Sequence, residues 1–318
     1  MLKTYVVQNP VSGQVGADVV REQIARVMED NQIPYEIYET TGSEKLHEVV
    51  EAAIQRGFEQ FIAVGGDGTI AGVASGLVNS ELPLVILPSG TVNALARELQ
   101  IPIGIQDGAD WWVSNRQIRK IDVMQIKDRY FLLNVSVGVS ASIMKDADRE
   151  EINKLGVFAF VRQAFKRKSN LPAYQFQVSI DGAVTNMRAT ELFIANSGTL
   201  LGLKALQLDP NADLDTGRLS VCYARMRSLF DYVRIGLKLI AAPTDENKEL
   251  NCTDAFKDIR IHANQPVPVQ GDGEQVGTTP VTITLVPRAL HIVVPGGKPD
   301  QGFNLKRQIY SKPVQASL

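Results

Sequence analysis

The first 126 residues alternate between short apolar runs and segments with helical spacing, and this alternation limits the fold more than any other feature of the chain. The runs TYVVQ, YEIYET, QFIAV and LVIL have the length and composition of strands. Between them, Ala17–Asp30 and Ser43–Arg56 carry apolar residues on one helical face, and further helices are expected to end near Asn79 and Leu99. Strands that alternate with helices predict a parallel sheet covered on both faces. We therefore predict a Rossmann-like α/β domain over residues 1–126.

From about Phe131 the apolar residues recur at every second position, in YQFQVSID, RLSVCYA, DIRIHA and TITLVPRALHIVV. Such strands are half buried and typical of antiparallel sheets. Two segments with helical spacing, Leu155–Phe165 and Arg227–Ile240, interrupt them. A chain of 318 residues is also long enough for two cores, because single cores commonly stop growing near about 250–300 residues. We predict a second domain, a mainly antiparallel β-sandwich, over residues 127–298.

Charge and composition exclude several classes of function. The formal net charge is −2 and the pI is near 6.0, so no global positive field attracts nucleic acid, and we expect none as a partner. No apolar stretch reaches the ~18 residues of a membrane span, and the N-terminus has the pattern of a first strand, so we expect a cytoplasmic protein. Cys222 and Cys252 are too few for a disulfide framework and lack metal-binding spacing, so we expect a reducing compartment. The sequence leaves a homodimer open.

The segment Leu155–Lys168 combines phenylalanines with the basic residues Arg162, Lys166, Arg167 and Lys168. Such a segment can make a peripheral contact with an anionic membrane at its inner face. A helix with one apolar face and a basic end is more often an ordinary domain helix. The sequence keeps both interpretations open.

Glycine-rich turns follow the first, third and fourth predicted strands, at Asn9–Gly13, Gly65–Thr69 and Ser89–Thr91. Each lies at the carboxyl end of a strand and just before a helix, where backbone N–H groups and the helix dipole favour an anion. A single turn of this kind can serve tight geometry alone. Their occurrence together at one edge of a sheet favours a phosphate-bearing ligand.

The GGDGT turn differs from the common nucleotide-binding loops. A dinucleotide fingerprint normally follows the first strand and has an acid about 20 residues later, whereas GGDGT follows the third strand. A Walker loop needs Gly-Lys-Ser/Thr, which the sequence lacks. Asp67 would repel a bare phosphate unless a divalent cation or a water lies between them. The turn therefore suggests a magnesium-bound nucleotide and disfavours a dehydrogenase.

A second acidic turn, Asp272-Gly273-Glu274, lies near the end of the chain. Asp-Gly is a common hairpin signal, so on spacing alone a polar hairpin turn is the simpler interpretation.

Several motifs together resemble the diacylglycerol kinase catalytic-domain family, which includes bacterial lipid kinases and sphingosine kinases and is related to NAD kinases. They run over nearly the whole chain: NPVSG, VGGDGT, LPSGTVNALARELQIP, KIDV, FLLNVSVGVSA, LDPNADLDTGRLSV and VQGDGE. The resemblance implies a lipid kinase that uses ATP and Mg²⁺, with its site in the cleft between two domains. The acceptor would be a hydroxyl of a diacylglycerol, a sphingoid base or a phospholipid, among which the sequence does not choose. It also implies that the tail, residues 299–318, returns to the first domain.

The resemblance also assigns roles to individual residues. Asp67 and Asp122 would organise Mg²⁺ and its waters, with Asp122 as the bridge to the acceptor. Asp272, supported by Glu274, would accept the proton of the lipid hydroxyl. Asp213 and Asp215 lie in a loop that resembles a second metal site. The residues that would hold the nucleotide are Asn9, Ser12, Gly13, Thr41, Gly65, Gly66, Asp67, Gly68, Thr69 and Thr91.

The chain departs from the family's motifs at several positions. Ala71 and Gly72 stand where an Asn and a Glu are common, and Ala94 stands where many members have an acid. Gln14 stands where some members have a lysine, and Thr216 stands where the second metal loop usually has an acid. These changes keep a second interpretation open, in which the chain is a catalytically inactive nucleotide- or lipid-binding protein on the same scaffold.

Overall fold

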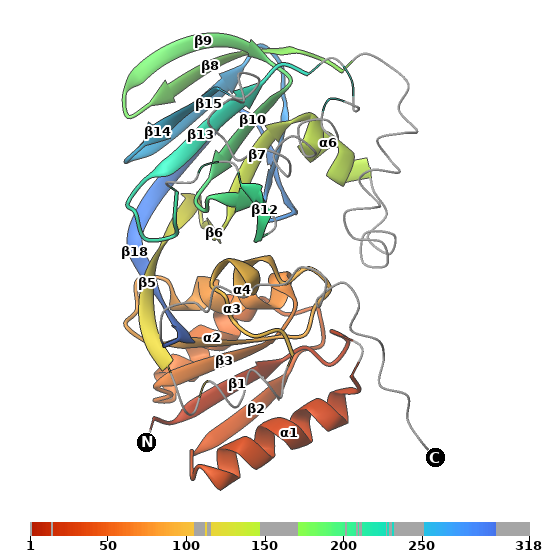
Figure 1. Ribbon diagram of the computed structural model, residues 1–318, viewed down its shortest axis with the longest axis vertical. Coiled ribbons are helices and arrows are strands. Elements are labelled where there is room, and N and C mark those ends of the chain that lie inside the picture. Colours follow the sequence, from red (N-terminus) through yellow and green to blue (C-terminus); the bar gives the residue numbers. More distant parts are fainter. Residues whose placement is uncertain are drawn as a thin grey trace.

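The computed structural model describes residues 2–13, 15–104, 112, 116–146, 171–200, 202–207, 209, 212–226, 228, 231 and 251–296. Gln14, the predicted helix Leu155–Phe165, the basic residues Arg162 and Lys166–Lys168, the tail 299–318 and nearly all of Arg227–Ile240 lie outside these residues. Figure 1 shows two stacked parts, an α/β part that contains the N-terminus and a β-rich part, joined by two long strands.

Parallel strands in the order β2-β1-β3-β4 form the sheet of the α/β part. Every residue of β1, β3 and β4 is buried, because helices cover both faces of this sheet. Helix α1 packs on one face through Val20, Ile24 and Met28, whereas α2 and α3 pack on the other. The bounds are β1 Thr4–Gln8, α1 Ala17–Asp30, β2 Tyr35–Glu39, α2 Leu46–Gln55, β3 Gln60–Gly65, α3 Asp67–Leu77, β4 Leu84–Pro88 and α4 Ala94–Glu98.

The predicted elements of this part are confirmed, with one correction at the start of α2. That helix begins at Leu46, three residues later than the sequence pattern indicates at Ser43. The reason is local, since the backbone N–H groups of Thr41 and Ser43 donate to the side chain of Glu44 and form a turn ahead of the helix.

The β-rich part contains a six-stranded antiparallel sheet in the order β14-β13-β10-β7-β16-β17. It faces the strands β18, β15, β8 and β9 of the larger, ten-stranded sheet. Side chains of both sheets, such as Val137 and Ile194 on one side and Val178, Ile261 and Ile283 on the other, belong to a single core. This is the predicted sandwich. The bounds are β7 Asn134–Gly138, α6 Val139–Asp146, β8 Tyr174–Ile180, β9 Ala183–Ala189, β10 Glu191–Ala195, β11 Thr199–Leu200, β12 Leu203–Gln207, β13 Leu219–Ala224, β14 Asn251–Ala255, β15 Asp258–Ala263, β16 Pro268–Gly271 and β17 Glu274–Thr278.

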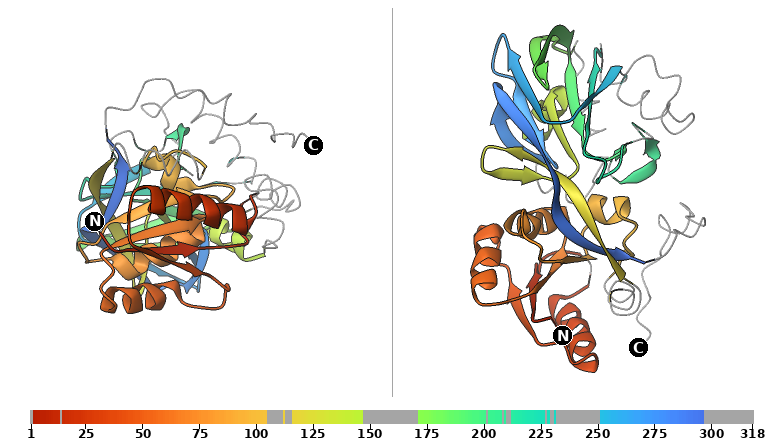
Figure 2. Two further views of the ribbon diagram at one scale, coloured as in Figure 1. Left: turned by 90° about the horizontal axis from the view of Figure 1, so that it is seen from below. Right: turned by 90° about the vertical axis from the view of Figure 1, so that its left-hand side faces the viewer.

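The two parts share a long antiparallel ribbon made of β5 (Arg116–Ile126) and β18 (Val281–Pro295), to which the short β6 (Arg129–Phe131) is added. Figures 1 and 2 both show this ribbon running from one part to the other. The first half of β18 pairs with β15, and Ile292 in its second half pairs with Leu84 of β4. The register shifts between Val286 and Leu290, where Arg288 has a φ of 52°. One strand therefore contributes to both cores, which the alternating pattern alone does not indicate. The division at residues 126 and 298 stays a prediction.

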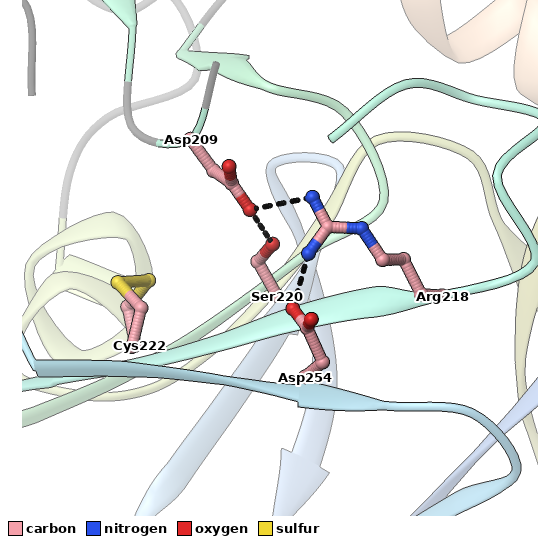
Figure 3. Close-up of a disulfide and its surroundings, with 6 residues drawn as sticks. Asp209, Arg218, Ser220, Cys222 and Asp254 are labelled. Atoms are coloured by element: carbon pink, nitrogen blue, oxygen red, sulfur yellow. Dashed lines mark hydrogen bonds and ion pairs between the residues drawn. A yellow bond between two sulfur atoms is a disulfide. The ribbon is translucent and has the colours of Figure 1, made fainter. Parts of the chain in front are cut away.

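Cys222 on β13 and Cys252 on β14 form a disulfide, which Figure 3 shows. The two residues are direct partners in the antiparallel register of these strands. The cysteine count, from which a reducing compartment was expected, did not indicate this bond, because a count carries no information about which strands pair. Among the described residues, no helix combines the length and apolar character needed to cross a membrane.

Candidate functional site

The three predicted glycine-rich turns meet at one edge of the α/β sheet, beyond the carboxyl ends of β1, β3 and β4. Asn9 Nδ2 donates to Thr69 Oγ1 at 3.1 Å, which joins the first turn to the second. Ser89 Oγ donates to Ser12 Oγ at 3.0 Å, and Ser89 N donates to Gly65 O at 3.0 Å. The turns therefore form one connected surface. It contains the predicted residues Asn9, Ser12, Gly13, Gly65, Gly66, Asp67, Gly68, Thr69 and Thr91.

Two glycines are needed for this close packing. Gly13 has a φ of +90°, and a Cβ there would lie 2.6 Å from Ser89 O. A Cβ on Gly90 would lie 2.6 Å from Gly66 Cα, so the second and third turns touch through bare backbone. Gly68 differs from them, because it has no positive φ and the nearest atom to an added Cβ is Glu274 Oε1 at 4.0 Å. Its surroundings within the protein are open.

Asp67 is the first residue of α3 and follows Gly66 at the cap position. Its Oδ1 is buried and makes no hydrogen bond within the described residues. Burial raises the pKa of the Asp67 carboxyl above its ordinary value, while the nearby backbone N–H groups of Ala94, Leu95 and Asn93 oppose this rise. Arg97 adds a positive charge to the same surroundings. Asp67 is thus a carboxylate with spare acceptor capacity at the amino-terminal ends of α3 and α4.

Asn93 belongs to the same site, although its motif did not predict a role for it. It caps α4 in the left-handed conformation, with a φ of 50°, and its side chain is buried. Nδ2 donates to Gly90 O at 2.7 Å, whereas Oδ1 is buried without a partner among the described residues. The available signal was the GTVN motif, from which only Thr91 was predicted to bind the nucleotide. Arg97 lies one turn after Asn93, within the longer segment LPSGTVNALARELQIP.

Asp272 approaches Asp67 from the β-rich part. It lies between β16 and β17 and forms an Asp-Gly hairpin turn, with φ values of 47° at Asp272 and 84° at Gly273. The hairpin interpretation therefore holds for the backbone. The Asp272 carboxylate points inward and accepts hydrogen bonds from the backbone N–H groups of Leu132 at 2.6 Å, Leu133 at 3.0 Å and Asn134 at 2.9 Å.

Two effects compete at this carboxylate. Burial raises the pKa of Asp272 above its ordinary value, the three backbone donors oppose that rise, and the negative charge of Asp67 adds to it. The charge of Asp67 reaches Asp272, and Glu274 Oε1 lies 4.0 Å from a Cβ built on Gly68, so the two acidic turns lie near one another although they are about 200 positions apart in sequence.

Glu274 and Thr41 have partners of their own. Glu274 is exposed and forms an ion pair with Arg129, with Oε2 at 2.6 Å from Nη2. Thr41 lies beyond β2, where its hydroxyl donates to Glu44 Oε2 at 2.6 Å. Bonds from Thr41 lower the pKa of Glu44 to about 2. The roles predicted for both residues stay predictions.

Asp122 on β5 is fully buried and has a partner for each carboxylate oxygen. Oδ1 accepts from the backbone N–H of Arg288 at 2.7 Å, and Oδ2 accepts from that of Gly217 at 2.6 Å. The turns of Asp67 and Asp272 lie near one another, whereas Asp122 ties β5 to the irregular middle of β18 and to the loop before β13.

Asp213 and Asp215 are paired with one arginine instead of facing each other across an open space. Arg119 Nη2 lies 2.6 Å from Asp213 Oδ1, and Arg119 Nε lies 2.9 Å from Asp215 Oδ2. Within the described residues there is no group of three or more His, Cys, Asp or Glu side chains arranged to hold a metal ion.

Comparison with known families covers both parts of the chain. Residues 3–126 match the diacylglycerol kinase catalytic domain, and residues 133–294 match the YegS C-terminal NAD kinase β-sandwich-like domain. An uncharacterized protein of Synechocystis is 29% identical over 92% of this chain and 70% of its own length. A Bacillus subtilis protein named diacylglycerol kinase is 25% identical over 95% of this chain and 99% of its own length.

The fold is also found among solved structures. A putative diacylglycerol kinase of Bacillus anthracis superposes with a TM-score of 0.77 at 23% identity, over 92% of this chain and 96% of that one. The resemblance drawn from the motifs is therefore confirmed. This chain belongs to the diacylglycerol kinase catalytic-domain family and carries the YegS-type C-terminal domain.

Proposed function

We propose that this protein is an ATP- and Mg²⁺-dependent lipid kinase, which transfers the γ-phosphoryl group of ATP to a hydroxyl of a lipid. One observation carries the proposal: the acidic turn that contains Asp272 and Glu274 approaches the glycine-rich turn that contains Asp67, with Glu274 Oε1 4.0 Å from a Cβ built on Gly68. Phosphoryl transfer requires little covalent chemistry from a protein and depends mainly on positioning and on neutralising charge. The site offers both.

The nucleotide phosphates would lie on the connected turns. Their glycines expose backbone N–H groups, and the amino-terminal end of α3 adds a partial positive charge. The unpaired oxygens of Asp67 and Asn93 suit a ligand that brings its own positive charge or donors, as a hydrated cation does. Asp67 would hold Mg²⁺ through this oxygen, and the cation would supply neutralisation of the phosphate charge.

Asp272 would act as the base. The acceptor oxygen forms a bond to the γ-phosphorus while the bond from that phosphorus to the β–γ bridging oxygen breaks, and ADP leaves. The hydroxyl proton passes to the Asp272 carboxylate, which three backbone N–H groups hold in a fixed orientation. A pKa above the ordinary value for aspartate makes this carboxylate a better proton acceptor.

The second candidate is an inactive nucleotide- or lipid-binding protein, which the departures from the family motifs favour. One of these departures has a structural reason. A Cβ on Gly72 would lie 2.9 Å from Leu46 Cδ1, so this position serves the packing of α3 against α2. A larger residue at position 72 would push α2 and α3 apart. The absence of the Glu that is common at this position is therefore explained by packing and says little about catalysis.

Incubating the full chain with labelled ATP, Mg²⁺ and a panel of lipids tests the proposal. The panel contains a diacylglycerol, a sphingoid base and a phospholipid with a free hydroxyl, and phosphorylated lipid is measured after extraction. We expect one of these acceptors to be labelled. Nucleotide binding without labelling of any lipid would favour the inactive protein.

We also propose that this protein is cytoplasmic and contacts an anionic membrane through Arg162 and Lys166–Lys168. Sedimentation with anionic vesicles at two salt concentrations tests this contact, because binding should be weaker at the higher salt concentration.

A further inference from the structure

The loop of residues 212–218, here called the clasp loop, leads into β13 of the six-stranded sheet and reaches the long strand β5. Leu214 is fully buried in the core of the α/β part, in the same cluster as Leu95 and Ile121. Leu214 O accepts from Asp122 N at 2.6 Å, and Gly217 N donates to Asp122 Oδ2 at 2.6 Å. The clasp loop thus fastens the β-rich part to β5 through backbone bonds and one apolar side chain.

Arg119 lies three residues before Asp122 on the same strand and binds the same loop. Its guanidinium group pairs with Asp213 at 2.6 Å through Nη2 and with Asp215 at 2.9 Å through Nε. The Arg119 side chain is 24% exposed, against 52% for Asp213 and 41% for Asp215. Burial would lower the pKa of Arg119, yet the bonds to Asp215 and Asp213 raise it above its ordinary value. The same pairing lowers the pKa of Asp215.

The other end of the clasp loop is held by a second arginine. Arg218 pairs with Asp209 at 3.0 Å and with Asp254 on β14, and Ser220 donates to Asp209 Oδ2 at 2.6 Å. Figure 3 shows this group beside the disulfide. The acids around the loop therefore already have guanidinium partners.

A divalent cation does not fit between Asp213 and Asp215. It would lie beside a guanidinium group that contacts both carboxylates, so the two positive charges would repel each other. No third acid completes the group within the described residues, so backbone oxygens or waters would have to supply every further ligand of a cation there. The second metal site implied by the family resemblance is not supported by these residues.

We propose that the guanidinium group of Arg119 neutralises Asp213 and Asp215 in place of a divalent metal. The attachment of the clasp loop to β5 is then independent of such a metal. In this arrangement Arg119 is a positioning residue. It positions the loop that contacts Asp122, and its proposed role involves no contact with the nucleotide or the acceptor.

Thermal unfolding of the full chain without nucleotide, in EDTA and in Mg²⁺, tests the proposal. Arg119→Met keeps the apolar stem of the side chain but removes the charge, whereas Arg119→Lys keeps the charge but loses the planar fork. We expect Arg119→Met to lower Tm by about 2–4 °C in EDTA and Arg119→Lys to lower it by less. Arg260→Met is the matched control, since Arg260 forms one exposed pair with Asp258, and we expect it to leave Tm within about 1 °C.

To test whether a metal binds in the clasp loop, the effect of Mg²⁺ on Tm is compared between the parent protein and the double variant Asp213→Asn/Asp215→Asn. This comparison remains informative even if Arg119→Met does not fold. We expect any effect of Mg²⁺ on the Tm of the parent to persist in this double variant. An effect of Mg²⁺ that the double variant loses and Asp67→Asn keeps would place a metal in the clasp loop and overturn the proposal. Equal Tm values for Arg119→Met and Arg119→Lys would overturn it as well, because the charge would then not matter.

Discussion

Asp67 and Asp122 are aspartates in the same α/β part, but their surroundings differ in one respect. Both oxygens of Asp122 accept a backbone N–H, and the residue is fully buried. Asp67 has a buried oxygen with no partner among the described residues, close to the amino-terminal ends of two helices. Buried polar groups normally have partners, because an unpaired group costs about 1–3 kcal/mol. We infer from this difference that Asp122 stabilises the fold and that the unpaired oxygen of Asp67 binds a ligand.

Asp272 lies between these two cases. Its three backbone donors resemble the fixed surroundings of Asp122, whereas its interaction with Asp67 connects it to the ligand site. A catalytic base needs both features, since it must be held in position and must still accept a proton.

The largest expected effect is that of Asp272→Asn on turnover. The amide cannot accept the hydroxyl proton, so we expect kcat on the best lipid to fall about 10²- to 10⁴-fold. Nucleotide affinity should change little, and calorimetry with ATP measures it separately. Asp128→Asn, in an exposed turn, is the matched control and should retain parental activity. Full activity of Asp272→Asn would mean that this carboxylate belongs with Asp122 as a structural residue.

The variant Asp67→Asn should reduce activity through the metal. We expect the Mg²⁺ concentration for half-maximal activity to rise about 10- to 100-fold, because the amide removes the charge that holds the cation. Raising Mg²⁺ should restore part of the rate, which distinguishes this variant from Asp272→Asn. If the variant has the parental Mg²⁺ response, Asp67 does not hold the cation.

The sequence was sufficient for the elements of the α/β part, because each βα turn is read from residues close together in the chain. It was insufficient for β18. The run TITLVPRALHIVV has the pattern of one strand, but nothing in its alternation indicates that its first half joins one core and its second half the other. The Pro287-Arg288 pair was the available signal, since proline within a strand pattern commonly marks an irregularity.

The candidate site, like the fold, could be predicted only in part from the sequence. Motifs predicted roles for Asp67 and Asp272, and the structure adds that their two turns lie near one another. The partners of Asp122, Asp213 and Asp215 could not be predicted, because Gly217, Arg288 and Arg119 lie far from them in the sequence. The spacing of acids in a loop can indicate a metal site, but it does not reveal an arginine that reaches the loop from another strand.

Gly68→Val tests the ligand side of the comparison. The position has no positive φ and no close neighbour, so the side chain should be accommodated in the free protein. We expect it to weaken ATP binding by about 10-fold or more by blocking approach to the backbone. Gly16→Val is the control, since a Cβ at Gly16 also has no neighbour within 4 Å. Unchanged ATP affinity of the folded Gly68→Val protein would remove this turn from the nucleotide site.

Asp122→Asn tests the structural side. The amide places N–H groups against one of two backbone donors, which leaves a buried donor unpaired at a cost of about 1–3 kcal/mol. We expect a lower Tm in thermal unfolding and a lower midpoint concentration in urea unfolding. The Mg²⁺ response of the remaining activity should be unchanged. The family resemblance instead predicts that both the Mg²⁺ response and turnover suffer. A stable Asp122→Asn protein with an altered Mg²⁺ response would reverse the assignment of Asp122.

The smallest effect concerns the interaction between Asp67 and Asp272. In the folded protein the pKa of Asp272 is raised, so the folded state binds more protons than the unfolded chain at pH values just above the ordinary aspartate range. Stability should therefore fall as pH rises through that window. Because the charge of Asp67 contributes to the rise, Asp67→Asn should move the Asp272 midpoint to lower pH and reduce this loss. Carbon-13 NMR of the carboxyl groups, without nucleotide or Mg²⁺, measures the midpoint directly, with Asp128→Asn as the control. A midpoint that does not respond to Asp67→Asn would mean that the two acids do not act on one another, which would contradict the placement of both in one site.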